Sequence, residues 1–447
     1  MSKRPWLVCL GTTAFLVGVA CLLPAASAAP LPADASPLLQ QAKEFQERGQ
    51  WIDACRAYDE LLRKDRNQPE IREAYQKCLR HVLQARRHRD QAFRQALLNL
   101  KPLPAAAVYE EVLVKLRANY IDRSLVEVAD LFQRGLEEFL FALEDEVFLR
   151  EHLAGIRRDA IDAFRTRRDT WRTRQPQTTS EARDQALDLA FAARRSLGLE
   201  PAVVIFEFIC GACNGLDEYT YYLTPGQLID AQTALKGDLG GIGSVESALL
   251  LEDATRIGLI RISGFCEGTV QELREALAQL QTRGAEVLIL DLRGNPGGLF
   301  RPAVQVAEVF LPEGVIVLTH SRLRGYNRTF KADNPQAVDL PLVVLVDGET
   351  ASAAEVVAGA LKENQRATLV GQTTFGKGSI QTVLSLDRVP AGMPAGIHIT
   401  VARFISPANY PYTGRGVTPH EVVDAGPEAQ LLAARAAAQR LALMMGR

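Results

Sequence analysis

The chain has 447 residues, of which 47% are hydrophobic and 23% are charged. These values are typical of globular proteins, and they exclude a disordered, collagen-like or disulfide-framework chain. The 51 basic and 53 acidic side chains give a net charge of −2, so the chain lacks the basic surplus of a nucleic-acid binder. The length predicts about three domains.

Residues 1–28 have the pattern of a secretory signal. The pattern consists of the basic pair Lys3 and Arg4, an apolar run over residues 6–23 and the small-residue cleavage motif Ala26-Ser27-Ala28. We therefore expect export and removal of this segment, which places the mature protein in the periplasm or another extracytoplasmic space. The alternative is that the segment stays uncleaved as a membrane anchor.

The cysteine pattern leaves more than one interpretation open. Five cysteines follow residue 28, so at least one stays unpaired within the chain. Cys210 and Cys213 have the spacing of a thiol–disulfide couple, but a local disulfide or two packed thiols would give the same pattern. No second ligand pair for zinc is visible, and we expect no metal or other cofactor.

The first half of the chain is predicted to be helical. Residues 37–100 resemble a tetratricopeptide-like helical hairpin, in which Pro69 begins a further helix. This hairpin either forms a peptide-binding groove or is an ordinary pair of helices. Residues 105–235 are predicted as more helices that lead into the next region. An adaptor or a second copy of the chain would have these N-terminal helices available for binding.

A cluster of basic residues lies within this helical region, at Arg157, Arg158, Arg165, Arg167, Arg168, Arg172 and Arg174. The acidic residues Asp159, Asp162 and Asp169 are interspersed with them. We interpret the cluster as a solvated helix face and do not expect it to bind nucleic acid.

Residues 236–425 change to alternating strands and helices, which predicts an α/β core with a partly parallel sheet. The expected strands are 257–262, 287–292, 315–318, 342–346, 368–370, 380–386 and 397–404. The expected helices are 269–281, 302–310 and 351–364, and residues 427–447 form a C-terminal helix. Catalytic chemistry in such a core is expected where strands give way to helices.

Two loops at such positions could carry this chemistry. The glycine-rich loop over residues 291–298 either brings backbone N–H groups close to a ligand or is a plain turn. The loop over residues 347–355 places Ser352 at a helix N-terminus, where free N–H groups can stabilise an oxyanion. Ser352 and Glu355 also match a capping box, so the serine has the alternative role of an N-cap.

A third loop, over residues 371–379, nearly matches a phosphate-binding loop. It has Gly378 where that motif needs a hydroxyl, and a predicted strand follows it, so we do not expect nucleotide binding. What remains is Lys377 in a glycine turn. A desolvated, neutral lysine can serve as the base for a serine nucleophile, and no histidine lies in these loops. If this segment is a strand, Gln381 shares a face with Lys377 and can orient it.

Taken together, these loops resemble the carboxy-terminal processing (tail-specific) serine proteases, peptidase family S41. The resemblance covers about residues 214–424, with Ser352 and Lys377 separated by the family's interval of 25 positions. Five motifs occur in family order: Leu-Asp-Glu-Tyr-Thr-Tyr-Tyr-Leu-Thr-Pro at 216–225, Gly-Gly-Ile-Gly at 240–243, Asn-Pro-Gly-Gly at 295–298, Thr-Ala-Ser-Ala at 350–353 and Phe-Gly-Lys-Gly-Ser-Ile-Gln at 375–381.

The resemblance implies a ClpP/crotonase-like α/β core, preceded here by helices, that hydrolyses polypeptides through an acyl-enzyme. It implies that Ser352 is the nucleophile, Lys377 the general base and Gln381 the group that orients it. The oxyanion would be bound by the N–H of Ala353 and that of Gly297 or Gly298.

One departure from the family pattern concerns the PDZ domain that usually follows the Gly-Gly-Ile-Gly segment. Here only the 13 residues 244–256 separate that segment from the next expected strand, which is too few for a PDZ domain. This puts recognition of a substrate C-terminus in doubt, because PDZ domains bind C-terminal peptides as an added strand. The alternative function is a non-catalytic peptide- or protein-binding scaffold that retains the fold.

Overall fold

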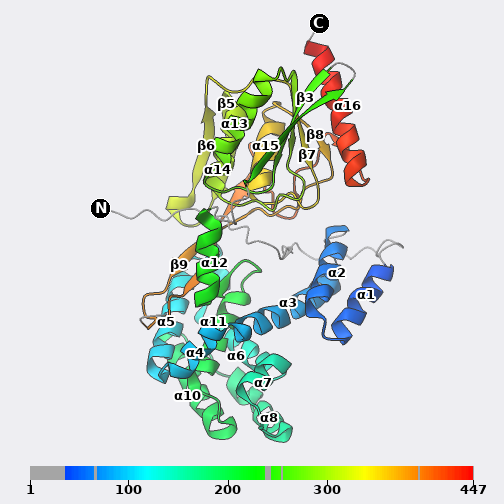
Figure 1. The fold of residues 1–447 in the computed structure, drawn as a ribbon. Coiled ribbons are helices and arrows are strands. Elements are labelled where there is room, and N and C mark those ends of the chain that lie inside the picture. Colours follow the sequence, from blue (N-terminus) through cyan, green and yellow to red (C-terminus); the bar gives the residue numbers. More distant parts are fainter. Residues whose placement is uncertain (1–35, 65–67, 237–242, 253–254, 391–392, 446–447) are drawn as a thin grey trace. The chain divides into compact units, whose positions relative to one another are not determined.

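The computed structural model describes residues 36–64, 68–236, 243–252, 255–390 and 393–445 (Figure 1). It divides the chain into two compact units. The helical unit contains the described residues of 36–230 and 383–400, and the α/β unit contains those of 231–382 and 401–445. The expected signal segment, and residues 240–242 of the Gly-Gly-Ile-Gly motif, lie outside the described residues.

The helical unit is built from amphipathic helices with ordinary start and stop signals. Three of its helices begin with proline, which lacks the N–H that a first helical residue would leave unpaired. The helices are α1 (Ser36–Glu47), α2 (Trp51–Lys64), α3 (Pro69–Arg89), α4 (Gln91–Asn99), α5 (Pro102–Asn119), η2 (Arg123–Leu125), α6 (Val128–Ala142), α7 (Glu146–His152), α8 (Arg158–Arg165), α9 (Arg168–Arg172), α10 (Thr179–Leu197) and α11 (Pro201–Asn214). Helices α1, α2 and α3 share one apolar cluster, which includes Tyr58 and Leu61.

Two buried glycines let helices α6 and α11 approach each other closely. A Cβ atom on Gly211 would lie 2.4 Å from the carbonyl oxygen of Arg134, and one on Gly135 would lie 2.7 Å from Phe208 Cδ1. Both distances are below any normal carbon contact. The crossing of these two helices therefore depends on the absence of side chains at both positions.

The α/β unit contains a six-stranded sheet in the order β11-β8-β7-β4-β3-β2. Its strands are β2 (Val245–Glu252), β3 (Thr255–Ile262), β4 (Val287–Asp291), β7 (Leu342–Val346), β8 (Thr368–Gly371) and β11 (Glu421–Val422). All pairings are parallel except that of β2 with β3. Strands β4 and β7 are buried along their whole length, as expected for central parallel strands covered on both faces.

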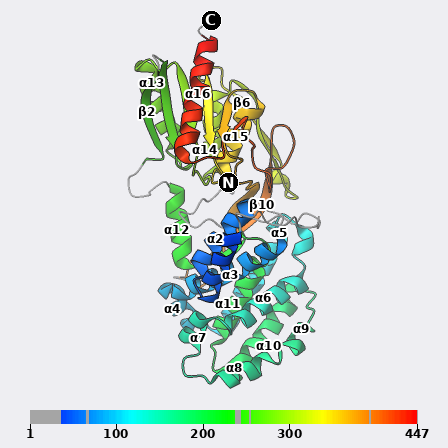
Figure 2. The same ribbon diagram turned by 90° about the vertical axis from the view of Figure 1, so that its right-hand side faces the viewer.

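Helices cover this sheet and complete its core. They are α13 (Thr269–Thr282), α14 (Phe300–Phe310), α15 (Ala353–Glu363) and α16 (Pro427–Met445). Small residues of α16, Ala434, Ala437 and Ala438, pack against Ile289 and Val343 of the sheet, and Figure 2 shows this helix lying along it. Among the residues described, no helix is both long and apolar enough to cross a bilayer.

The remaining elements are α12 (Pro225–Lys236), η3 (Arg324–Tyr326) and the strands β1 (Tyr221–Leu223), β5 (Glu313–His320), β6 (Arg328–Asp333), β9 (Ser379–Ser385) and β10 (Gly396–Ile405). In the helical unit, β1 pairs with the first residues of β10; in the α/β unit, β5 pairs with β6 and with the last residues of β10. The predicted α/β core preceded by a helical region is confirmed. The residues of β1, β2, β6 and β11 were not expected as strands.

Candidate active site

The three loops singled out in the sequence meet at one edge of the parallel sheet. They follow β4, β7 and β8, which are neighbours in the sheet, so the loops leave from adjacent carboxyl ends. Thr350 joins all three: its Oγ1 donates to the carbonyl oxygen of Leu292 at 2.9 Å, and its own carbonyl oxygen accepts from Phe375 N–H at 2.9 Å. The convergence of these loops follows from the strand order.

Ser352 directly precedes α15 and has an unusual backbone conformation. Its φ of 57° and ψ of −117° lie in a region that side-chain-bearing residues rarely adopt. Such strain persists only where the surrounding structure enforces it, and it occurs most often at functional sites. The side chain is 1% exposed, and its Oγ has no hydrogen-bond partner in the part of the chain that the structure describes.

Of the two side-chain hydrogen bonds of a capping box, only the one accepted by the Glu355 carboxylate is formed, and the Ser352 hydroxyl makes no cap hydrogen bond. The Glu355 carboxylate accepts from Ser352 N–H at 2.8 Å. The Glu355 N–H donates to the carbonyl oxygen of Ser352 at 2.9 Å, so this bond does not engage Oγ. An N-cap role therefore does not account for the serine hydroxyl.

Glu355 is a buried carboxylate that connects the serine loop to the lysine loop. Its Oε1 accepts from Thr374 Oγ1 and from Gly376 N–H, both at 2.6 Å. Its Oε2 accepts from the N–H groups of Ser352 and Lys377, both at 2.8 Å, so these two nitrogens can be no farther apart than twice that distance. Burial raises the pKa of Glu355, and these hydrogen bonds offset only part of that rise.

The sequence indicated Glu355 only as a capping partner, and its second role was missed. The signal that could have found it is its charge on an otherwise apolar helix start, Ala-Ala-Glu-Val-Val-Ala, where a buried carboxylate needs several donors. The glycine turn of the lysine loop supplies two of them.

Lys377 and Gln381 do not lie on one strand, so the expectation that they share a strand face is not met. Strand β9 begins at Ser379, so Lys377 precedes it in the glycine turn. That turn packs tightly, since a Cβ on Gly378 would lie 2.4 Å from Thr413 N. Gln381 is buried, and its Nε2 donates to Ser379 Oγ at 2.8 Å.

The two candidate oxyanion glycines differ in what their N–H groups do. Asn295 donates through Nδ2 to the carbonyl oxygen of Ile262 at 2.9 Å, and its Oδ1 accepts the N–H of Gly297 at 2.9 Å. Among the described residues, the N–H groups of Gly298 and Ala353 have no acceptor. Gly297 has a φ of 105°, and a Cβ on it would lie 2.9 Å from Ser352 Cβ, so only glycine fits there.

The structure distinguishes between the alternatives left open for the cysteines. The five cysteines of the described residues are free thiols, and no His, Cys, Asp or Glu group of three or more in the described ranges is arranged to hold a metal ion. Cys210 and Cys213 are buried on α11, and burial raises the pKa of the Cys210 thiol to about 12. Such a thiol is unreactive, which favours the packed-thiol alternative.

Comparison with known proteins connects this geometry to a family. The model of peptidase family S41 matches residues 256–423, which include all three loops. Residues 256–423 belong to peptidase family S41. The chain is 46% identical over 168 residues to a carboxyl-terminal-processing protease of Synechocystis sp., an alignment that covers 38% of each chain. It is 36% identical over 247 residues to one of Picosynechococcus sp., covering 55% of this chain and 57% of that protein.

These alignments leave part of each curated relative unmatched: the chain spans between 38% and 57% of their length. Among solved structures, a photosystem II D1 C-terminal processing protease aligns with 72% of this chain and 93% of its own, at 21% identity and a TM-score of 0.47. The family match covers most of the α/β unit and residues 383–400 of the helical unit, and helices α1 to α12 lie outside it.

Proposed function

We propose that this S41 domain is a serine endopeptidase in which Ser352 attacks the carbonyl carbon of a peptide bond. Lys377 takes the hydroxyl proton, Gln381 orients the lysine, and the resulting acyl-enzyme is hydrolysed by water. The observation that carries the proposal is the conformation of Ser352: strained, at a helix N-terminus, with a buried hydroxyl that its capping box does not use. The Glu355 carboxylate supports the assignment of Lys377 as the base, because it accepts from the backbone N–H groups of both Ser352 and Lys377.

The oxyanion of the tetrahedral intermediate would be bound by Ala353 N–H and Gly298 N–H. We favour Gly298 over Gly297 because the Gly297 N–H already donates to Asn295. Both proposed donors are backbone groups fixed by their loops, so they need no reorganisation as charge develops. In this scheme Asn295 is a positioning residue, since it fixes the glycine loop against β3.

The proposed substrates are polypeptides, as the names of the relatives suggest, and the proposed location is extracytoplasmic. Residues 1–28 support export through their sequence pattern alone. Only the 11 residues 244–254 lie between the glycine motif and β3, too few for a PDZ domain, and eight of them form β2. We therefore propose cleavage without PDZ-mediated recognition of the substrate C-terminus. We further propose that the N-terminal helices bind an adaptor or a second copy of the chain.

The test is cleavage of an unstructured protein such as casein by the purified chain. We expect Ser352→Ala, Lys377→Ala and Lys377→Arg each to reduce the rate at least 1,000-fold, on the order seen when members of a nucleophile–base pair are removed. Ser247→Ala, an exposed serine on β2, serves as the matched control and should keep full activity. Retained cleavage by Ser352→Ala would overturn the assignment.

The same preparation tests the scaffold alternative. A serine-reactive fluorophosphonate probe should label the wild-type chain and not Ser352→Ala. If the wild-type chain neither cleaves casein nor reacts with the probe, the non-catalytic scaffold becomes the better description. The near-complete burial of Ser352 Oγ is the observation that supports the scaffold alternative.

A further inference from the structure

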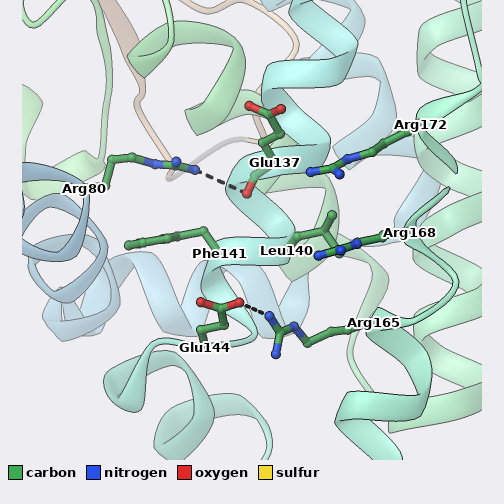
Figure 3. A pocket seen from close by; sticks show the side chains of 8 residues that line it. All are labelled: Arg80, Glu137, Leu140, Phe141, Glu144, Arg165, Arg168 and Arg172. Atoms are coloured by element: carbon green, nitrogen blue, oxygen red, sulfur yellow. Dashed lines mark hydrogen bonds and ion pairs between the residues drawn. The ribbon is translucent and has the colours of Figure 1, made fainter. Parts of the chain in front are cut away.

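The basic cluster noticed in the sequence contributes to a surface pocket on the helical unit. The pocket has a volume of about 240 Å³. Figure 3 shows Arg165, Arg168 and Arg172 one above another, with their guanidinium groups directed at helix α6. The other lining residues are Arg80, Glu137, Leu140, Phe141 and Glu144.

Arg165 is the last residue of α8, and Arg168 and Arg172 are the first and last residues of α9, with a two-residue turn between the helices. Thr166 N–H donates to the carbonyl oxygen of Asp162 at 3.0 Å, and Thr170 N–H to that of Arg167 at 3.1 Å. Positions three and four residues apart lie on one helix face. At a rise of about 1.5 Å per residue, Arg168 and Arg172 of α9 are about 6 Å apart along the helix axis.

Two buried aromatic residues lie on the helices that carry these arginines. Phe164 and Trp171 are almost fully buried, and their ring centroids are 4.7 Å apart. They anchor the two short helices in the core of the helical unit, next to the face that carries the arginines. Packing of these rings therefore fixes the helix backbone from which the arginines project.

The pocket carries positive charge that its own acidic residues do not neutralise. Arg165 is paired with Glu144, and Arg80 binds Glu138 at 3.0 Å while stacking 4.5 Å over the Phe141 ring. Arg168 has only an exposed ion pair with its neighbour Asp169 at 3.8 Å, a type that contributes little. Arg172 has no ion-pair partner in the described ranges, and of the acidic lining residues only Glu137 is likewise unpaired there.

The chemistry of this lining selects carboxylates displayed along a chain. An arginine guanidinium binds a carboxylate with two parallel hydrogen bonds. Alternate side chains of an extended chain are about 6.7 Å apart, which is close to the spacing of Arg168 and Arg172 along α9. Leu140 and Phe141 offer apolar surface between the charges, and the small, open volume suits side chains of a segment rather than a whole cofactor.

We propose that this pocket binds an acidic, extended segment of a polypeptide, with carboxylates at alternate positions on Arg168 and Arg172. Nucleic acid fits less well, because Glu137 and Glu144 lie in the lining and the chain's net charge is −2. The inference is independent of the chemistry at Ser352. It concerns binding only, so it stands or falls separately from the proposed peptidase activity.

The test measures binding to the full chain carrying Ser352→Ala, which prevents cleavage. A fluorescein-labelled peptide with four alternating Glu residues is titrated by fluorescence anisotropy, beside a peptide with Gln in their place. We expect saturable binding of the Glu peptide and at least 10-fold weaker binding of the Gln peptide. Arg168→Glu with Arg172→Glu should weaken binding of the Glu peptide at least 10-fold.

The matched control is Arg195→Glu, an exposed arginine on α10 outside the pocket, which should change the Kd less than twofold. Circular dichroism verifies that the variants remain folded, and Arg168→Gln with Arg172→Gln provides a milder pair that should also weaken binding. Equal weakening by Arg195→Glu would overturn the proposal, because the attraction would then depend on net charge alone. Displacement by equimolar inorganic phosphate or single-stranded DNA would overturn it too, since the site would not be selective for an acidic chain.

Discussion

At the scale of single residues, the backbone of Ser352 departs most clearly from ordinary geometry. A positive φ of 57° costs free energy for any residue with a Cβ, and glycine avoids most of that cost. We expect the free energy of unfolding of Ser352→Gly to be about 1 kcal/mol higher than that of Ser352→Ala. Neither variant has a nucleophile, so the comparison concerns stability alone. Urea titrations followed by circular dichroism measure the difference. If Ser352→Ala proved as stable as Ser352→Gly, the serine would not be strained.

Glu355 is the residue on which the relative placement of the two loops depends. In Glu355→Gln one acceptor oxygen becomes an amide N–H₂, which would face two donors that the carboxylate accepts. We expect a loss of about 2–4 kcal/mol in unfolding free energy and at least 10-fold slower casein cleavage. Glu313→Gln, an exposed carboxylate at the start of β5, is the matched control. Full activity in Glu355→Gln would show that the loops keep their positions without the carboxylate.

At the scale of elements, the contact between α6 and α11 is the one most sensitive to a single methyl group. Gly211→Ala places a Cβ 2.4 Å from the Arg134 carbonyl oxygen, and backbone atoms cannot rotate away. We expect the helices to separate and the unfolding free energy to fall by about 2–3 kcal/mol, measured from the helical signal at 222 nm. Gly325→Ala, which has open space around it, should change stability by less than 0.5 kcal/mol, a typical surface effect. An unchanged Gly211→Ala would mean that this packing is loose.

Elements with strong periodic or apolar patterns could be predicted from the sequence, and those that depend on partners could not. Strand β7 coincides with the expected 342–346, because a run of buried β-branched residues bounded by polar loops has few other interpretations. Strand β2 was missed because its side chains are largely exposed and only its pairing with β3 makes it a strand. The same holds for β11, which has two residues.

In the candidate site, too, local features could be predicted from the sequence and features that depend on distant partners could not. Ser352 and Lys377 could be singled out from loop position and spacing, since both features are local. The bridging role of Glu355 could not, because its four donors come from two loops that only the sheet order brings together. The preference for Gly298 over Gly297 likewise depends on one side-chain hydrogen bond, from Gly297 to Asn295.

At the scale of the whole molecule, the helical unit is notable for a buried charged network. Arg87 donates to Glu207 at 2.6 Å and to Glu138 at 2.7 Å, and all three side chains are almost fully buried. His88 contacts Glu207 at 2.8 Å and His152 at 2.9 Å, which extends the network toward α7. Although burial raises the pKa of Glu207, Arg87 and His88 lower it below its usual range, so this carboxylate stays charged. The network therefore makes the stability of this unit depend on pH through its histidine end.

His152 sets the direction of that dependence. Burial, followed by His88, lowers the pKa of His152 to about 4, and Glu151, Glu207 and Arg94 also act on it. In the unfolded chain its pKa is about 6.5, so between pH 6.5 and about 4 the unfolded state binds more protons than the folded state. We expect the unfolding free energy of the helical unit to fall as the pH decreases through this window, by on the order of 2 kcal/mol from this group.

Urea titrations at 222 nm across pH 4–7 measure the slope. His152→Gln should make the slope shallower, whereas His320→Gln, an exposed histidine, should leave it as in the wild type. A wild-type slope in His152→Gln would assign the pH dependence to other groups, because this imidazole is the only one removed by that substitution.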